Sequence, residues 1–333
     1  MMPVRNDAHF LPASLGCLEQ FCDRVLIVVD EQTTDDSVAV AKSFRKTEVI
    51  TNTSATGTAT RNGALVTARA LLFEAFRSFE GRNIGLCTDA DEITPPRLFA
   101  RLRDTVAAAD RPGGVFALWW VQLWKSLDAY RDDQSVWSNS WKPMLFHDDG
   151  RMRYPDEQSP FHESRTPLPP VAQAAVPLEG FPVLHLQWAY WERTQYKQAW
   201  CRVNEFIFRQ FTDAIDINAR YAITLGEPNE GVTPVPPAWF DGVPALPQPD
   251  DPLPNWHREQ IFELFHEYGP ARFEPLQIWH IGELHDCFVA QIGRPPVHAI
   301  AQPPKPGLVV RAVRRFVPEP MRAVVRRVRR QLS

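Results

Sequence analysis

RVLIVVD, at residues 24–30, is the most informative stretch of this sequence for the class of fold. Its five central residues, 25–29, are all apolar, and all but one of them are β-branched. Such a run predicts a strand buried on both faces of a parallel sheet, because a half-exposed strand would alternate apolar and polar side chains. The run ends on a carboxylate, Asp30.

Helical and strand patterns alternate along the chain after this run. We predict a helix at 35–45, a strand at 48–51, a long helix at 58–79 and a strand at 83–88. This alternation is typical of a doubly wound α/β sheet, in which ligands bind beyond the carboxyl ends of the strands. Only MMPV precedes Arg5, so the first strand is expected to be a stub unless the true start lies upstream.

The second half continues with predicted strands at 115–124, 137–146 and 181–188, and predicted helices at 96–108, 191–211 and 256–268. Nine prolines between Gly226 and Pro254 argue against regular structure there and favour a wrapping segment or linker. We therefore expect a catalytic domain at 1–215, a Pro-rich and helical extension packed on it at 216–304, and a tail at 305–333.

The charge of the chain is unevenly distributed. The formal net charge is -4, yet residues 305–330 hold nine Lys or Arg against one acid, Glu319. Positive charge is not spread over the expected active-site half, which argues against a nucleic-acid partner. From Met321 to Leu332 an apolar stripe runs beside arginines, as in a helix lying on anionic lipid, although a solvated or partner-docking helix would share this pattern.

Cysteine usage and hydropathy bear on the location of the protein. The five cysteines form no CxxC pair, so they indicate neither a disulfide framework nor a zinc site. No segment reaches the roughly 18 apolar residues that a spanning helix needs. We expect a cytoplasmic protein, and the basic tail leaves open a peripheral place on the inner face of the cell membrane.

Thr88-Asp89-Ala90-Asp91-Glu92 is the strongest local signal for chemistry. It follows the apolar strand predicted at 83–88. Two carboxylates with one residue between them can share a divalent cation and a ribose, because Mg²⁺ and Mn²⁺ prefer oxygen ligands together with donor phosphates. Acidic triplets are also common in solvated turns, and it is the position after a buried strand that favours a metal site.

The first part of the chain resembles the family-two glycosyltransferases of the GT-A type. The resemblance rests on MPVRND at 2–7, the acidic residue after the second strand, TDD at 34–36, Arg61-Asn62-Gly63-Ala64 and the Asp-x-Asp at 89–91, in the family's order. It covers about residues 1–105. The sequence departs from the pattern at Glu31-Gln32, where the family commonly has Asp-Gly.

This resemblance implies a donor site and a Mn²⁺ or Mg²⁺ cofactor. Asp30 would accept a hydrogen bond from the base, usually uracil, and Asp89 would contact the ribose or sugar. Asp91 would bind the metal. Asp89 and, from its own chemistry at a strand end, His185 are our further candidate ligands. The other implied residues are Pro3, Arg5 and Asn6 at the nucleotide and Arg61 and Asn62 near the ribose or diphosphate.

The second half resembles, more loosely, the members that act on lipopolysaccharide core or related surface glycans. The matching pieces are KPMLF at 142–146, FHE at 161–163 and VLH at 183–185, followed by the helix with Trp191, Glu192 and Lys197. An inverting transfer needs a carboxylate to take the proton of the acceptor hydroxyl. Glu163 is the candidate, with Glu157 and Asp156 as alternatives.

Several other residues were weighed as site residues or as structure. His185 at a strand end is a candidate for the metal or the diphosphate, and a packed structural histidine is its alternative. The tryptophans of the run 115–124 are more often core than sugar platforms. We assign structural roles to His147, His257, His266, His280 and His285.

The favoured function is therefore a metal-dependent transfer of a sugar from a nucleoside diphosphate, expected to be UDP, to a cell-surface glycan or lipid-linked acceptor. A catalytically silent sugar-nucleotide or glycan-binding protein with the same fold is the alternative. A nucleotidyltransferase ranks last, because residues 3–9 lack a Gly-rich loop with basic residues.

Overall fold

The computed structural model describes residues 1–51, 61–109, 111–133, 138, 140–154, 165–171, 173–208, 213–225 and 231–297, without the side chains of 51, 61–67, 208 and 224. The chain divides into two compact units. The first comprises Met1–Gln198 and Gly226–Gln260, and the second comprises Ala199–Leu225 and Ile261–Ser333. The predicted boundaries at 215 and 304 stay a prediction, and the segment at 216–304 contributes to both units.

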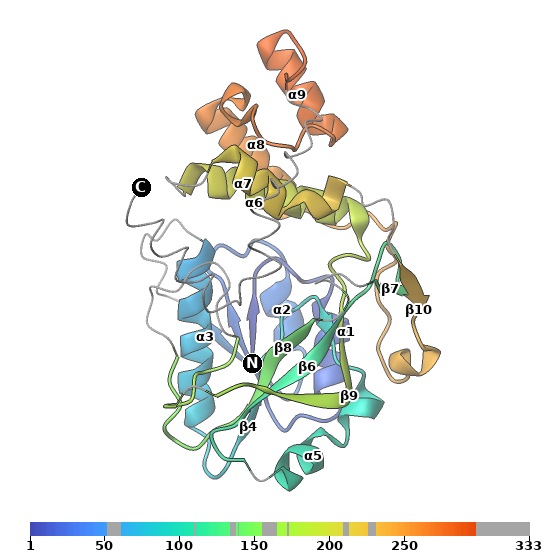
Figure 1. Ribbon diagram of the computed structural model, residues 1–333. Coiled ribbons are helices and arrows are strands. Elements are labelled where there is room, and N and C mark those ends of the chain that lie inside the picture. Colours follow the sequence, from blue (N-terminus) through green and yellow to red (C-terminus); the bar gives the residue numbers. More distant parts are fainter. Residues whose placement is uncertain are drawn as a thin grey trace, which may run out of the picture. The chain divides into compact units, whose positions relative to one another are not determined.

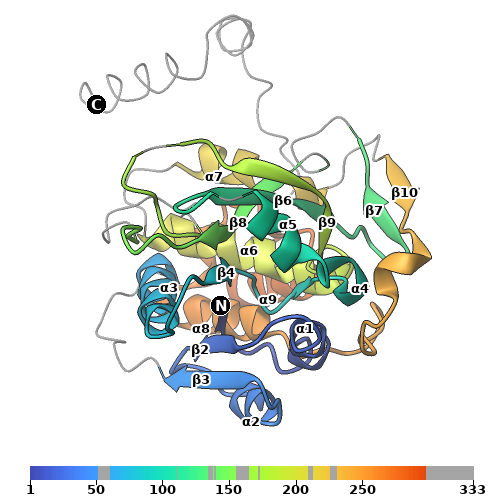
Figure 2. The same cartoon turned by 90° about the horizontal axis from the view of Figure 1, so that it is seen from below.

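A three-stranded parallel sheet opens the first unit. Its order is β1 (Met2–Val4), β2 (Val25–Val29), β3 (Thr47–Thr51). All five residues of β2 are buried, because α1 (Leu11–Leu18) covers one face and α3 (Arg61–Arg77) covers the other (Figure 2). The prediction of a strand buried on both faces is confirmed. The third helix of this region, α2 (Ser37–Lys42), contacts β3.

A second sheet of five strands has the order β4 (Ile84–Leu86), β8 (Trp141–His147), β6 (Val115–Gln122), β9 (Val176–His185), β5 (Glu92–Ile93). Only the β6–β9 pairing is parallel. The backbone of Met1 joins the two sheets, since its amine donates to the Leu86 carbonyl oxygen at 2.8 Å and its carbonyl accepts from the Thr88 N–H at 3.1 Å. The carboxyl end of β4 thereby lies beside β1.

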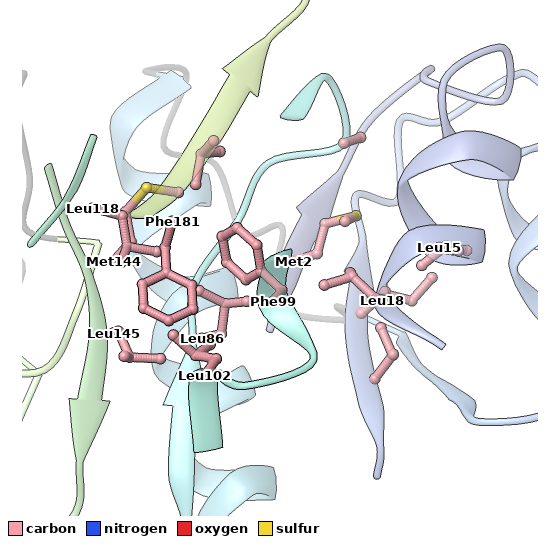
Figure 3. Close-up of a cluster of buried hydrophobic side chains, with 14 of the residues drawn as sticks. Met2, Leu15, Leu18, Leu86, Phe99, Leu102, Leu118, Met144, Leu145 and Phe181 are labelled. Carbon is pink, nitrogen blue, oxygen red and sulfur yellow. The ribbon is translucent and has the colours of Figure 1, made fainter. Parts of the chain in front are cut away.

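The main hydrophobic core lies across this junction (Figure 3). Met2 of β1, Leu15 of α1, Leu118 of β6 and Phe181 of β9 belong to one buried cluster, each at most 2% exposed. Burial of side chains of this size stabilises the fold by roughly 1.5–3 kcal/mol each. The two sheets are thus anchored to each other by a shared core, which fixes the strand ends relative to one another.

The rest of the first unit is short elements. The helix predicted at 96–108 is two helices, α4 (Pro96–Phe99) and α5 (Leu102–Ala108). A ribbon of β7 (Ala129–Arg131) and β10 (Val232–Pro234) is antiparallel, and a 3₁₀ helix at Pro237–Phe240 follows it. The Pro-rich segment therefore contains short regular elements, contrary to the prediction. The prolines of these elements lie in a two-stranded ribbon and in the first turn of a 3₁₀ helix, where a missing backbone N–H is tolerated.

Two long helices begin in the first unit and end in the second (Figure 1). They are α6 (Trp191–Phe208) and α8 (Trp256–Tyr268), and α8 has the predicted bounds. The second unit adds α7 (Ala214–Arg220), with Asp213 as its side-chain cap, and α9 (Gly282–Ile292), with 3₁₀ helices at Ala222–Leu225 and Pro270–Phe273. Its core includes Phe265, Phe273 and Trp279 in ring contact.

The predicted α/β class, with a mixed sheet and a helical C-terminal part, is confirmed. The first strand is short, as expected, and comprises Met2–Val4. None of the helices in the ranges described above is both long and apolar enough to cross a bilayer.

Candidate functional site

A pocket of about 170 Å³ lies at the carboxyl ends of β1, β2 and β4. This is the edge at which the alternation of strands and helices predicts a ligand. Acidic and basic side chains line it together with a few apolar ones and two aromatic rings. The lining residues are Pro3, Val4, Arg5, Asp7, Val28, Asp30, Ala68, Asp89, Ala90, Asp91, Arg193, Lys197, Trp256 and His257.

Five residues predicted for the donor site line this one pocket. Pro3 and Arg5 come from β1 and its end, Asp30 follows β2, and Asp89 and Asp91 follow β4. The backbone bond from the Asp30 N–H to the Val4 carbonyl oxygen, 2.9 Å, keeps the first two strand ends together. The roles assigned to these residues stay predictions, but their convergence agrees with a common site.

Asn6 does not line the pocket. Its side-chain oxygen accepts bonds from the backbone N–H groups of Thr34 and Asp35, at 2.7 and 3.3 Å, and so fixes the loop after β2. The backbone of Asn6 has φ 52°, a left-handed conformation that Asn tolerates better than most residues. Asn6 therefore shapes the edge of the pocket through this loop.

Asp89 is paired with two arginines. Its Oδ1 lies 2.8 Å from Arg69 Nη2, and its Oδ2 lies 2.8 Å from Arg165 Nη2. Burial alone would raise the pKa of Asp89, but Arg165 and then Arg69 bring it below its ordinary value. Asp89 is thus an ionised carboxylate with both oxygens occupied by guanidinium groups.

Arg165 also binds the fully buried Glu92. Its Nη1 lies 2.6 and 2.7 Å from the two carboxylate oxygens of Glu92, which also accept from Trp120 Nε1 at 2.6 Å and from the Asp89 N–H at 2.9 Å. Short charge-assisted bonds of this kind are the strong ones in proteins. The cluster sets the conformation of the turn that carries Asp89 and Asp91.

We expect Arg165→Met to destabilise the protein by about 3–5 kcal/mol, because it leaves Glu92 buried without a counter-charge. Burial already raises the pKa of Glu92 in the wild type against the opposing effect of Arg165. Loss of Arg165 should raise this pKa further above the unfolded value of about 4.3. Stability from a raised pKa is complete at low pH and lost as the pH rises. The free energy of unfolding of the variant should therefore fall between about pH 5 and about pH 8.

Urea unfolding of the wild type and the variant measures this effect. Arg97→Met is the matched control, because Arg97 makes a single bond to Asp241 with 72% of its side chain exposed. An exposed pair of this kind contributes less than about 1 kcal/mol. Equal losses in the two variants would contradict the role of Arg165.

Asp91 faces a histidine and a lysine. Its Oδ2 lies 3.6 Å from His185 Nε2 and 3.4 Å from Lys197 Nζ, and its side chain is 10% exposed. Burial alone would raise the pKa of Asp91, but Lys197 and then His185 hold it well below the ordinary range. The backbone bond from the Leu186 N–H to the Asp91 carbonyl oxygen, 2.8 Å, fixes this residue beside the end of β9.

His185 has a defined orientation. Its Nδ1 donates to the side-chain oxygen of Gln122 at 2.7 Å, and its ring stacks on Trp120 with centroids 4.2 Å apart. Nε2 lies on the side of Asp91, and in the neutral ring with its proton on Nδ1 it would offer a lone pair to a metal ion. This is the support that metal-binding histidines usually receive.

Asp91 and His185 fit a divalent metal ion as a pair of ligands. Two donor atoms that bind one ion at about 2.1 Å lie roughly 3–3.6 Å apart, and the observed separation is 3.6 Å. In the part of the chain that the structure describes, no group of three His, Cys, Asp or Glu residues could bind a metal. Water and donor phosphate oxygens would complete the shell, and Asp89 as a third ligand stays a prediction.

Strand β6 supports the site with alternate residues. Trp120 and Gln122 point to Glu92 and His185, as described above. The preceding residue, Trp119, packs instead against Tyr130 and Trp239, with centroids 5.7 and 5.6 Å away. Of the tryptophans weighed in the sequence, Trp120 therefore belongs to the site.

Further residues of the pocket come from sequence-distant segments. From α6, Arg193 Nη2 lies 3.3 Å from Asp7 Oδ1. Burial raises the pKa of Asp7 to about 6, against the opposing effect of Arg193. From the start of α8, the Trp256 ring lies 4.5 Å from the Arg5 guanidinium carbon. His257, predicted to be structural, also lines the pocket.

Other predicted residues cannot be placed. Glu163, with its alternatives Glu157 and Asp156, lies outside the described residues, as does the tail at 305–333. Arg61 and Asn62 begin α3, but their side chains are outside the described part of the chain. Their assigned roles stay predictions.

Comparison with known proteins finds weak likeness only. No protein-family model and no curated protein matches the sequence. The structure of a 4-diphosphocytidyl-2C-methyl-D-erythritol synthase is 22% identical, with a TM-score of 0.28, over 44% of this chain and 72% of that chain. S. aureus TarS 1-349 is 11% identical, with a TM-score of 0.33, over 88% of this chain and 90% of that chain. Values this low give no information about activity.

Proposed function

We propose that this protein is a glycosyltransferase that takes a sugar from a nucleoside diphosphate donor, UDP being the expected nucleotide. The observation that supports this most is the convergence of Arg5, Asp30, Asp89 and Asp91 from three strand ends in one pocket that basic residues also line. The same residues are the ones that the family-two resemblance selects. The acceptor would be a cell-surface glycan or a lipid-linked glycan.

The pocket suggests a place for each part of the donor. Asp30 would accept from the base beside Pro3, and Arg5 with Trp256 would offer a flat cationic surface to it. Asp89, ionised and oriented by Arg69 and Arg165, would accept hydrogen bonds from hydroxyl groups of the ribose or sugar. Asp91 would lie at the diphosphate.

Asp91 and His185 would bind Mn²⁺ or Mg²⁺ in this reaction. When bound, such an ion neutralises the charge that develops on the departing diphosphate. Gln122 keeps the Nε2 lone pair of His185 directed at the site. Arg165 and Glu92 keep Asp91 in place through the turn that they fix.

Glu163 is our candidate base for an inverting transfer. It would remove the acceptor hydroxyl's proton as the oxygen attacks the anomeric carbon from the face opposite the diphosphate. Glu163 lies two positions before Arg165 in the sequence. The guanidinium of Arg165 binds Asp89 and Glu92 at the site.

A donor-hydrolysis screen tests the function. UDP-, GDP- and TDP-sugars are incubated with the purified chain and Mn²⁺ or Mg²⁺, and release of the nucleoside diphosphate is measured. We expect metal-dependent release from one nucleotide class. If a donor binds but no nucleoside diphosphate is released, even after candidate glycan acceptors are added, the result would favour the catalytically silent binding protein.

The basic tail would place the enzyme at an anionic membrane, where a lipid-linked acceptor lies. We expect that removal of residues 308–333 leaves activity on a soluble acceptor nearly unchanged but abolishes sedimentation with anionic vesicles. Each Arg near such a surface contributes about 1 kcal/mol. Added salt should weaken vesicle binding of the full chain without eliminating it. Equal pelleting of the full-length and truncated proteins, or equal pelleting with neutral vesicles, would refute the tether.

A further inference from the structure

Two basic residues on one face of α6 point at the pocket. Arg193 and Lys197 are four positions apart, so they lie one helical turn from each other on the same side. Both line the pocket, and each faces a carboxylate, Asp7 or Asp91 respectively. Their side chains are only 7% and 16% exposed.

These two cations are held far less tightly than the arginines on the other side of the carboxylates. Arg193 and Lys197 each contact one carboxylate oxygen, at 3.3 and 3.4 Å. Arg69 and Arg165 lie 2.6–2.8 Å from their partners, and Arg165 makes several such bonds. Charge-assisted bonds are normally about 2.7–2.9 Å long. The contacts of Arg193 and Lys197 are longer than this and therefore weak, whereas those of Arg69 and Arg165 are not.

Desolvation makes this weak pairing costly. A cation that is largely removed from water loses several kcal/mol of hydration, which a single long contact does not restore. An anion that brings two or three oxygens between Arg193 and Lys197 would restore it. The guanidinium carbon of Arg193 also lies 5.4 Å from the centroid of the Phe10 ring, a contact that does not replace the lost hydrogen bonds to water.

We propose that Arg193 and Lys197 form a clamp for the diphosphate of the donor. This rests on the proposed function and adds to it a binding site that the sequence comparison does not supply. In the structure the two cations face Asp7 and Asp91. When the donor enters, they turn to the phosphate oxygens, and a divalent cation takes the place of Lys197 at Asp91.

The exchange predicts opposite effects of the loss of Lys197 on two affinities, that for a nucleoside diphosphate and that for a divalent cation. Loss of Lys197 should weaken binding of a nucleoside diphosphate, because a charged partner of the phosphates is gone. The same change should strengthen binding of a divalent cation to the protein without nucleotide, because Asp91 no longer has a competing counter-ion. Loss of Arg193 should weaken nucleotide binding only, since Arg193 faces Asp7.

The test uses the full chain and its variants Lys197→Met, Arg193→Met, Lys197→Arg and Lys42→Met. Lys42 is an exposed lysine of α2 that does not line the pocket, so it controls for the loss of one charge. UDP binding is measured by calorimetry without metal, and GDP and TDP are measured in the same way if UDP does not bind. Mn²⁺ binding is measured by electron paramagnetic resonance without nucleotide. Thermal melting shows that each variant is folded.

We expect the nucleotide affinity to fall about tenfold or more in Lys197→Met and in Arg193→Met, as for loss of a charged hydrogen bond. Lys197→Arg and Lys42→Met should bind nucleotide as the wild type does. The Mn²⁺ affinity should rise several-fold in Lys197→Met alone.

Unchanged nucleotide affinity in Lys197→Met and Arg193→Met, with a wild type that binds, would overturn the clamp and leave the proposed function standing. An unchanged Mn²⁺ affinity in Lys197→Met would overturn the exchange at Asp91. A wild type that binds none of the three nucleoside diphosphates, with or without Mn²⁺, would refute the proposed function and the clamp with it.

Discussion

Asp91→Asn should reduce turnover of the donor by at least about a hundredfold while the protein stays folded. The substitution keeps the shape of the side chain but removes the negative charge that faces His185 Nε2 and Lys197 Nζ. Metal stabilisation of a leaving group contributes several kcal/mol to a rate, and each 1.4 kcal/mol is a factor of about ten. Steady-state release of nucleoside diphosphate, with Mn²⁺ or Mg²⁺ present, measures the loss.

Asp36→Asn is the matched control for this experiment. Asp36 is exposed at the start of α2, makes no side-chain cap and does not line the pocket. It should leave turnover unchanged. Wild-type turnover in Asp91→Asn, or in the wild type with excess chelator, would refute the metal mechanism.

Glu163→Gln should lower the rate of transfer about a hundredfold or more with little effect on donor binding. A general base acts in the transition state, so its loss appears in kcat rather than in the affinity for the donor. Donor affinity and kcat are measured on the same preparation with a soluble acceptor.

Glu157→Gln provides the comparison, since Glu157 is the alternative base in the same segment. A collapse of donor affinity in Glu163→Gln with unchanged turnover of the bound donor would show that Glu163 belongs to the donor site and that the base lies elsewhere. A large loss of kcat in Glu157→Gln alone would assign the base to Glu157.

Local patterns predicted the elements that form the edge of the site. The run 25–29 is a buried strand because four of its five residues are β-branched and all are apolar. The rule that ligands bind at strand ends then brought Asp30, Asp89 and Asp91 together, and these residues line one pocket. Local sequence was enough for this prediction because Asp30, Asp89 and Asp91 come just after the end of a strand in the sequence.

The other wall of the pocket could not be predicted in the same way. Lys197 is 106 positions from its partner Asp91, and Arg193 is 186 from Asp7. A basic residue on an amphipathic helix has the same pattern whether it faces solvent or a pocket. Trp256 and His257 follow the Pro-rich segment, and nothing in their local sequence indicates that this segment returns to β1.

Some predicted features were altered by tertiary structure. The role of Asn6 at the nucleotide stays a prediction, and its side-chain oxygen accepts hydrogen bonds from the backbone N–H groups of Thr34 and Asp35. The helix predicted at 96–108 is interrupted between Phe99 and Leu102, both of which are buried in the main core. A helical period alone does not show whether one straight helix can bury both residues.

The alternation along β6 also limits how this protein can change in length during evolution. One face of β6 contributes Phe116 and Leu118 to the main core and Trp120 to the site. The opposite face contributes Val121 and Leu123 to a second hydrophobic cluster. A one-residue insertion or deletion within 118–122 would exchange the two faces, because side chains alternate with a period of two. Trp120 would then lose its bond to Glu92, and Gln122 would at the same time lose its bond to His185. Length changes should therefore accumulate in the loops that flank β6, while the strand itself varies only by substitution.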